Sequence, residues 1–347
     1  MVQTQEFLIA LGGNEFSELI NYKHINTIIM SIQAPEITSS TTSTSQKAYK
    51  PTSNGRYNIV GNHLLQEFSN EEILKDIAKR IADGRRLIIP IGLPQSGKSM
   101  FIASLIAYAF RRDNKEDNSC NFAVAGDRKE SGVDTILTAL DGSNVLPSTR
   151  PDEMTITDLD MESRYRKKRI KITLLDFSGE DIERLTGKRT DDEQSSAEKI
   201  KQILAACIAQ RAIFAILSPV DEQMLEVGYA SEFDKAEDTE MHSFITSLRT
   251  TSPRLYNMTK FLLIITKWDK LPKRVSPEKY IQLHRNTLYS EYSGFSRSYG
   301  LIPYSVGDVV GNTIIKMVLR SPRNFWYTLY RWCTGKHVLP WWKRILS

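Results

Sequence analysis

The sequence predicts an α/β fold in which a mainly parallel sheet is covered by helices on both faces. Two observations lead to this prediction. Short apolar runs of strand length alternate along the chain with segments that have the length and period of helices, the pattern of strands buried on both sides of a sheet. The 347 residues are 41% hydrophobic and 25% charged, close to the averages of globular proteins, which excludes a disordered or fibrous chain.

The predicted elements follow one another from residue 69 onward. Helices are expected, in chain order, at residues 69–84, 98–112, 197–210, 234–250 and 277–289. Strands are expected at residues 86–92, 154–159, 169–177, 212–217, 260–266 and 301–305. A polar turn joins the second and third of these strands, so the pair should form an antiparallel hairpin and make the sheet mixed.

The composition divides the chain into four parts. Residues 1–36 form an N-terminal segment whose role the sequence does not indicate. Residues 37–56 are rich in serine and threonine, and because such a polar segment buries too little surface to offset its ordering entropy, we expect a flexible linker. Residues 69–312 form the α/β domain, and residues 313–347 form a basic, aromatic, helical tail.

Several features concern the cellular compartment. No apolar run reaches the ~18–20 residues of a membrane-spanning helix, and the first residues lack the basic start of a secretory signal. The cysteines Cys120, Cys207 and Cys333 are widely separated, which fits a reducing environment better than a disulfide framework or a zinc cluster. The five histidines also lack the spacing of metal ligands. We therefore expect a cytoplasmic protein.

The net charge of +5 is concentrated in the tail. Residues 311–347 carry +7 and contain no acidic residue, which leaves −2 for the remainder, so we expect no specific binding of nucleic acid. The aromatic residues of the tail are Phe325, Trp326, Tyr327, Tyr330, Trp332, Trp341 and Trp342. Packing against the domain is the first interpretation, docking of a protein partner the second, and contact with a membrane surface the third.

A second group of basic residues crowds the turn of the predicted hairpin. It consists of Arg164, Arg166, Lys167, Lys168, Arg169 and Lys171. A solvated turn is the favoured interpretation, and contact with a partner or a phosphate group is the alternative.

The strongest motif lies between the predicted strand 86–92 and the helix that follows it. Residues 92–99 fit the pattern G-x-x-x-x-G-K-[ST], and the candidate binding residues are Gly92, Gln95, Ser96, Gly97, Lys98 and Ser99. The glycines let the loop wrap so that backbone N–H groups face a phosphate chain, and the helix adds its positive end. Lys98 would reach the β- and γ-phosphates, and the Ser99 hydroxyl would bind Mg²⁺.

A second motif follows the strand at 169–177. Asp176 stands at the end of this strand, where a carboxylate can hold Mg²⁺ through water. Gly179 can offer its backbone N–H to a γ-phosphate, so this loop would respond to the state of a bound nucleotide.

A third motif concerns the base of a nucleotide. Thr266, Lys267 and Asp269 form the pattern T-K-x-D directly after the strand at 260–266. One carboxylate can accept hydrogen bonds from both N1–H and N2–H₂ of guanine, whereas adenine has no such donor pair. Asp269 would therefore select guanine, with the stem of Lys267 along the ring.

With these three motifs in chain order, the sequence resembles the Ras-like, translation-factor-related clade of P-loop GTPases. The resemblance implies a three-layer P-loop domain that binds GTP with Mg²⁺ and usually hydrolyses it slowly to GDP. It also implies that Ser305 and Val306 contact the guanine base and that Thr149 completes the magnesium shell. The competitors for this last role are Thr135, Thr138 and Thr155.

The segments 91–99 and 175–180 further resemble the bacterial double-GTPase type, which is associated with multi-gene defence or signalling systems. Two features depart from the pattern of the clade. The chain from Lys98 to Asp176 spans 78 residues, longer than in a minimal small GTPase, so residues 111–146 should hold an insertion. Glu180 stands where Ras-like enzymes carry the glutamine that orients water, and its carboxylate could polarise water or be repelled by the γ-phosphate.

The leading hypothesis is a GTP-binding switch that hydrolyses GTP slowly and relays its state to a protein partner through the switch loops or the tail. The expected catalytic residues are Lys98, Thr149, Gly179 and Glu180, and the expected magnesium ligands are Ser99, Thr149 and Asp176. One alternative is a nucleotide-dependent scaffold without hydrolysis. The other is an ATP-using P-loop protein, for which the T-K-x-D match would be accidental.

Overall fold

The structure, a computed structural model, divides the chain into the units Met1–Lys50 and Pro51–Ser347. It describes residues 55–58, 70–110, 119–125, 133–146, 153–185, 194–209, 212–220, 231–251, 259–271, 275–294, 299–310 and 313–340. All of these residues belong to the second unit, and the N-terminal segment predicted at 1–36 lies outside them. Among the described residues, no helix combines the length and the apolar character that crossing a bilayer requires.

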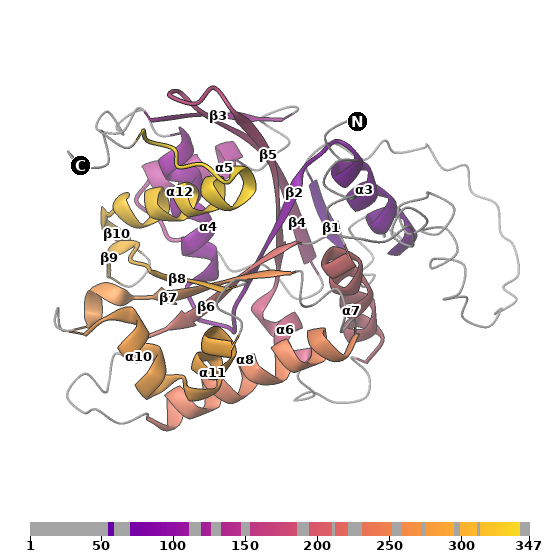
Figure 1. The fold of residues 1–347 in the computed structure, drawn as a ribbon, viewed down its shortest axis with the longest axis vertical. Coiled ribbons are helices and arrows are strands. Elements are labelled where there is room, and N and C mark those ends of the chain that lie inside the picture. The colour runs from indigo at the N-terminus through magenta and orange to yellow at the C-terminus, as the bar shows by residue number, and fades with distance from the viewer. Residues whose placement is uncertain are drawn as a thin grey trace, which may run out of the picture. The chain divides into compact units, whose positions relative to one another are not determined.

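The centre of the described unit is an eight-stranded mixed sheet in the order β1-β4-β5-β2-β6-β7-β8, with β3 paired to β4 (Figure 1). Its strands are β1 (Gly55–Asn58), β2 (Arg86–Ile91), β3 (Cys120–Val124), β4 (Glu153–Ser163), β5 (Arg169–Phe177), β6 (Ile213–Pro219), β7 (Lys260–Thr266) and β8 (Tyr299–Pro303). The strands from β5 to β8 in this order pair in parallel, and the pairs made by β4 are antiparallel. A separate hairpin consists of β9 (Gly307–Val310) and β10 (Thr313–Met317).

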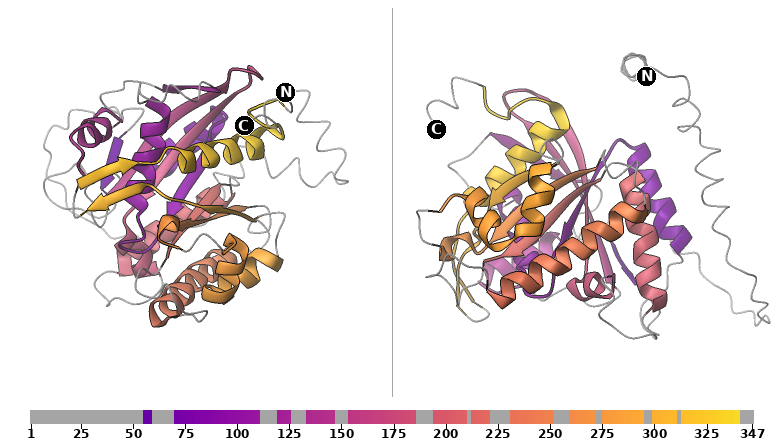
Figure 2. Two further views of the ribbon diagram at one scale, coloured as in Figure 1. Left: turned by 90° about the vertical axis from the view of Figure 1, so that its left-hand side faces the viewer. Right: turned by 60° about the horizontal axis from the view of Figure 1, so that its bottom comes forward.

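Helices cover both faces of this sheet, as Figures 1 and 2 show. They are α3 (Asn70–Ala82), α4 (Lys98–Phe110), α5 (Val133–Asp141), α6 (Gly179–Leu185), α7 (Gln194–Ala209), α8 (Glu232–Thr251), α10 (Pro277–His284), α11 (Asn286–Gly294) and α12 (Arg320–Thr334). Apolar residues of α3, α6, α7, α8, α10 and α11 form one core with one side of the sheet. Those of α4, α5 and α12 form the core on the other side. The predicted three-layer α/β fold is confirmed.

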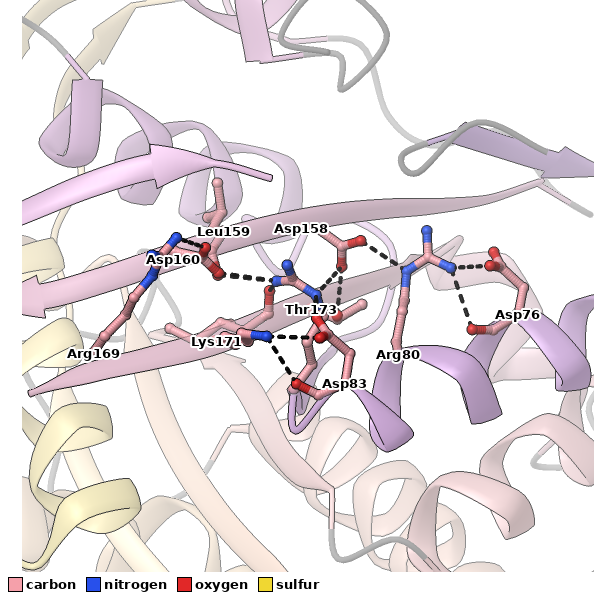
Figure 3. A network of polar contacts seen from close by, with 11 residues as sticks. Asp76, Arg80, Asp83, Asp158, Leu159, Asp160, Arg169, Lys171 and Thr173 are labelled. Atoms are coloured by element: carbon pink, nitrogen blue, oxygen red, sulfur yellow. Dashed lines mark hydrogen bonds and ion pairs between the residues drawn. The ribbon is translucent and has the colours of Figure 1, made fainter. Parts of the chain in front are cut away.

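The long hairpin of β4 and β5 is held in place by a network of buried ion pairs (Figure 3). Arg80 of α3 donates to Asp158 at 2.9 Å, and Arg85 donates to Asp160 at 3.2 Å. Burial raises the pKa of Asp158 despite the nearby charge of Arg80. Because an unpaired charge at such a position is costly, these contacts fix the hairpin against α3 and the turn that follows it. The hairpin in turn sets the position of Asp176 near the end of β5.

Several predicted boundaries are corrected by the structure. Gly55 and Arg56, placed at the end of the linker, belong to β1, because backbone pairing with the edge of β4 satisfies their polar groups whatever their side chains. The region 111–146 contains β3 and α5, and the insertion expected there stays a prediction. The helix predicted at 277–289 is interrupted at Arg285, where the backbone leaves the helical region (φ −137°, ψ 59°).

The boundary between the domain and the tail, predicted at 312/313, falls between the paired strands β9 and β10. The helix α12 is also part of the domain core, with Phe325, Trp326, Leu329 and Tyr330 fully buried. The indole N–H of Trp326 donates to the carbonyl of Leu105 in α4 at 3.3 Å. For α12, packing against the domain is therefore the interpretation that the contacts support. Packing was the first interpretation from the sequence, which also left docking of a partner and contact with a membrane open, because aromatic residues beside basic ones are typical of all three.

Candidate functional site

The loop at residues 92–99 joins β2 to α4 as a tight, glycine-dependent turn. Gln95 and Gly97 adopt the left-handed backbone conformation, with φ of 66° and 86°. A Cβ atom on Gly92 would lie 2.3 Å from the Ser96 hydroxyl oxygen, so only glycine fits there. The N–H groups in the first turn of α4 have no partner within their own helix. They are therefore available for an anion in the loop.

The ammonium group of Lys98 connects this loop to the end of β5. Lys98 is buried, with 7% of its side chain exposed, and it donates to the carboxylate of Asp176 and to the carbonyl of Phe177. The two predicted motifs, separated by 78 residues, are thus in direct contact.

Gly179 packs directly against the backbone of the glycine-rich loop. A Cβ atom at this position would lie 2.8 Å from the nitrogen of Pro94 and 3.0 Å from the carbonyl carbon of Leu93. The hydroxyl of Ser178 accepts a hydrogen bond from the N–H of Glu180 at 3.2 Å and so caps the start of α6. Because the neighbouring atoms belong to backbone, the first turn of α6 cannot move without changing its contact with the loop.

The third motif, T-K-x-D, contacts the glycine-rich loop at residues 92–99 from the other side. The Thr266 hydroxyl donates to the carbonyl of Ser96 at 2.7 Å, and both residues are buried. The N–H of Trp268 donates to the carbonyl of Tyr304 at 3.1 Å, which joins the T-K-x-D segment to the segment that contains Ser305. Lys267 adopts a left-handed conformation with φ of 57°.

The predicted base-contacting residues lie at the ends of neighbouring parallel strands. Asp269 is exposed at the end of β7, whereas Ser305 and Val306 follow β8 and are half-buried. The N–H of Ser305 donates to the Ser321 hydroxyl at 3.0 Å. Val306 accepts from the N–H of Val318 at 2.8 Å. These bonds anchor the second segment to the start of α12.

Thr149 lies outside the described residues, so its predicted role stays a prediction. Of its competitors, Thr135 and Thr138 lie on exposed positions of α5. Thr155 lies directly opposite Asp176 in the β4–β5 register.

The donors near Lys98 fit Mg²⁺. Ser99 supplies a hydroxyl and Asp176 a carboxylate, the hard oxygen ligands that Mg²⁺ prefers. The ammonium of Lys98 already places a positive charge against Asp176. Within the described residues, no group of three or more His, Cys, Asp or Glu could hold a metal ion. A magnesium ion at this position would therefore also need oxygen atoms from a bound phosphate.

Sequence reasoning missed Arg285, a fully buried residue that supports the third motif. It donates to the Ser218 hydroxyl at 2.8 Å and to the carbonyl of Pro219 at 2.7 Å, and it pairs with Asp234. Burial by itself would raise the pKa of Asp234, but the charge of Arg285 and hydrogen bonds hold that pKa below its ordinary value.

The end of β6 connects Arg285 to the loop. Val220, which follows Pro219, donates its N–H to the carbonyl of Thr266 at 3.1 Å. The ring of Tyr280, 5.9 Å from the Arg285 guanidinium, also packs edge-on against Trp268. No local pattern in the sequence identifies such a residue, because its partners are distant along the chain.

A comparison with models of protein families identifies the type of domain. A sequence model of the family described as Double-GTPase 1 matches residues 89–293. No curated protein matches the sequence.

Three solved structures illustrate the structural likeness. Roco2 RocCORdC of Methanosarcina barkeri bound to GDP is 12% identical with a TM-score of 0.33, and the match covers 73% of this chain but only 50% of that one. The signal recognition particle receptor complex SRβ-GTP/SRX from Chaetomium thermophilum is 11% identical with a TM-score of 0.39, covering 71% and 97%. Toc33 from Arabidopsis thaliana in complex with GDP and Mg²⁺ is 11% identical with a TM-score of 0.33, covering 77% and 92%.

Proposed function

The chain belongs to the Double-GTPase 1 family, and on this premise we propose that it is a molecular switch that hydrolyses GTP slowly with Mg²⁺. In this proposal, a protein partner distinguishes the GTP-bound chain from the GDP-bound chain. GTP binding follows from membership of the family. The slow hydrolysis and the relay to a partner are inferred from the site.

The observation that carries the proposal is the double contact of Lys98 with Asp176 and Phe177. A phosphate chain in the glycine-rich loop presents oxygen atoms that compete for the same ammonium group. When Lys98 turns to these oxygens, the end of β5 loses both contacts. Because Gly179 packs on the loop backbone only a few residues further on, the start of α6 has to respond. A partner that contacts α6 can then distinguish nucleotide states.

Six of the predicted site residues have the following roles in this proposal. Lys98 stabilises negative charge on the β- and γ-phosphates, and the N–H of Gly179 contacts the γ-phosphate. Asp269 accepts the guanine donors. Ser99 and Asp176, with Thr149, hold Mg²⁺, which neutralises phosphate charge when bound.

Hydrolysis depends on how water is oriented beside the γ-phosphate. Glu180 is half-buried at the start of α6, and its backbone is fixed by Ser178. An acidic side chain there can accept a proton from water, but the phosphate charge repels it. We therefore propose a slow intrinsic rate.

Equilibrium binding of GTP, GDP and ATP tests the proposed use of the site. Lys98→Ala should weaken binding of all three nucleotides, and Asp269→Asn should weaken GTP and GDP binding by more than about 100-fold, because guanine loses its paired acceptor. Lys279→Ala, an exposed lysine on α10, is the matched control and should bind normally. Preferential ATP binding by the unaltered chain would refute guanine selection.

Single-turnover hydrolysis distinguishes a switch from a scaffold. The unaltered chain should convert bound GTP to GDP, and Glu180→Ala should change the rate of this conversion when GTP is saturating. GTP that stays intact over many hours, in a chain that binds it selectively, would instead support the scaffold alternative.

A further inference from the structure

A group of basic residues, most of them exposed, lies at the end of the sheet opposite the proposed nucleotide site. The parallel strands β2, β5 and β7 begin with Arg86, Arg169 and Lys260. The loops of the nucleotide site follow the other ends of these strands. The two ends of these parallel strands therefore differ: one end carries basic residues and the other carries the nucleotide loops.

The turn between β4 and β5 extends this basic end. Arg164, Arg166, Lys167 and Lys168 follow one another there, and all are exposed. Tyr165 among them exposes 40% of its surface. The Arg164 guanidinium donates to the neutral side chain of Asn121 at 2.7 Å, so its charge stays uncompensated by that bond.

Residues from the C-terminal part of the chain meet this turn. The Ser163 hydroxyl donates to the carbonyl of Val338 at 3.0 Å, which brings the exposed Lys336 near the turn. The Lys260 ammonium lies 5.1 Å from the ring centre of Trp332 in the last turn of α12. The ribbon views place the end of α12 beside the turn of the β4–β5 hairpin (Figures 1 and 2). We call these residues the basic end: Arg86, Arg164, Arg166, Lys167, Lys168, Arg169, Lys260, Arg331 and Lys336.

Several cations of the basic end, although not Arg169, differ from the other arginines of the domain in their partners. Arg80, Arg85, Arg249 and Arg285 each pair with a carboxylate. In the described part of the chain, by contrast, no carboxylate pairs with Arg166, Lys167, Lys168, Arg331 or Lys336. Among the described residues, the acidic residues of the paired strands next to the turn are Glu162 and Asp160, and Asp160 already pairs with Arg85 and Arg169. The basic end therefore presents uncompensated positive charge to solvent.

We propose that the basic end docks on an anionic lipid surface. The charges come from a projecting turn, the starts of strands and the end of a helix, an arrangement suited to a broad surface. Tyrosine and tryptophan beside lysine and arginine favour the level of lipid headgroups. Tyr165 lies among the cations of the turn, and Trp332 lies beside Lys260. Docking in this way leaves the nucleotide loops, at the opposite strand ends, directed away from the lipid.

Co-sedimentation of the full chain with vesicles tests this proposal. Vesicles of phosphatidylserine and phosphatidylcholine should bind the protein, and vesicles of phosphatidylcholine alone should not. Each cation near such a surface contributes about fivefold in affinity. The triple variant Arg166→Gln, Lys167→Gln and Lys168→Gln should therefore bind roughly 100-fold more weakly, and added salt should weaken the unaltered protein in the same direction.

A matched variant controls for net charge. Lys201→Gln, Lys235→Gln and Lys279→Gln remove the same number of exposed charges from α7, α8 and α10 and should leave vesicle binding intact. GDP binding by both triple variants should equal that of the unaltered chain, which shows that they are folded. Equal losses in both variants, or binding to neutral vesicles, would overturn the proposal. Tight binding to duplex DNA without binding to vesicles would overturn it in favour of nucleic acid.

Discussion

Replacing Glu237 by glutamine should make the protein more stable in alkaline solution and change little in mildly acidic solution. Glu237 lies on α8 with 4% of its surface exposed. Among the described residues, its Oε1 atom has no hydrogen-bond partner. Burial raises the pKa of Glu237 from 4.5 to about 7. The charge of Arg285 opposes this shift, and the charges of Asp234 and Asp238 add to it.

The sign and size of the effect follow from this pKa. A carboxyl group whose pKa is raised by folding binds its proton more tightly in the folded state. The contribution of this proton to the free energy of unfolding is therefore lost as the pH rises from 4.5 to about 7. Each pKa unit corresponds to about 1.4 kcal/mol, so the ionised Glu237 costs about 3 kcal/mol at pH 8. Glutamine resembles the protonated acid and does not ionise.

The assay is chemical denaturation of both proteins without nucleotide between pH 5 and pH 8.5. The free energy of unfolding of the variant should exceed that of the unaltered protein by about 3 kcal/mol at pH 8, and the difference should shrink below about 1 kcal/mol at pH 5. Glu232→Gln, on the exposed side of the same helix, should show no such change with pH. A difference that stays constant across this range, or grows toward acid, would refute the reasoning.

Three further predictions concern the contacts that support the nucleotide loops. Thr266→Val removes the bond to the Ser96 carbonyl and should lower the free energy of unfolding by about 1–3 kcal/mol, with weaker GDP binding by calorimetry; unchanged GDP affinity would contradict the bracing role. Gly179→Ala places a methyl group 2.8 Å from the Pro94 nitrogen and should reduce GTP affinity more than GDP affinity, as measured by competition binding. Equal losses of GTP and GDP affinity would show that α6 does not sense the γ-phosphate. Arg285→Met removes the guanidinium from the buried Asp234, which then keeps His284 and the Ser231 N–H as partners, and should destabilise the fold by about 3 kcal/mol in thermal or urea unfolding; Arg249→Met, at a pair whose arginine side chain is 36% exposed, should cost less.

Much of the fold could be predicted because β2, β6 and β7 are short, mainly apolar runs. The strand β7 consists of apolar residues from Phe261 to Ile265 and ends at the predicted residue, Thr266. The strand β5 also has the predicted bounds. The three loop motifs were found because each follows such a strand, and the structure brings two of them together through Lys98 and Asp176.

The parts that could not be predicted depend on contacts between distant residues. The strands β1 and β3 are short and are ordered by pairing with the edge of β4 that does not pair with β5. The break at Arg285 reflects a guanidinium that is held by Ser218 and Asp234, which precede it by 67 and 51 residues. The role of α12 could not be chosen from its sequence, since burial of Trp326 depends on an acceptor in α4.

The place of α12 in the chain affects how the protein is made. Trp326 covers α4 at Leu105, although 221 positions separate the two residues. A ribosome adds roughly 5–20 residues per second, so α4 is synthesised about ten to forty seconds before the helix that shields it. During this interval the apolar side of α4 has to be kept from other chains. The timing of translation and the access of chaperones to the nascent chain should therefore govern the yield of soluble protein.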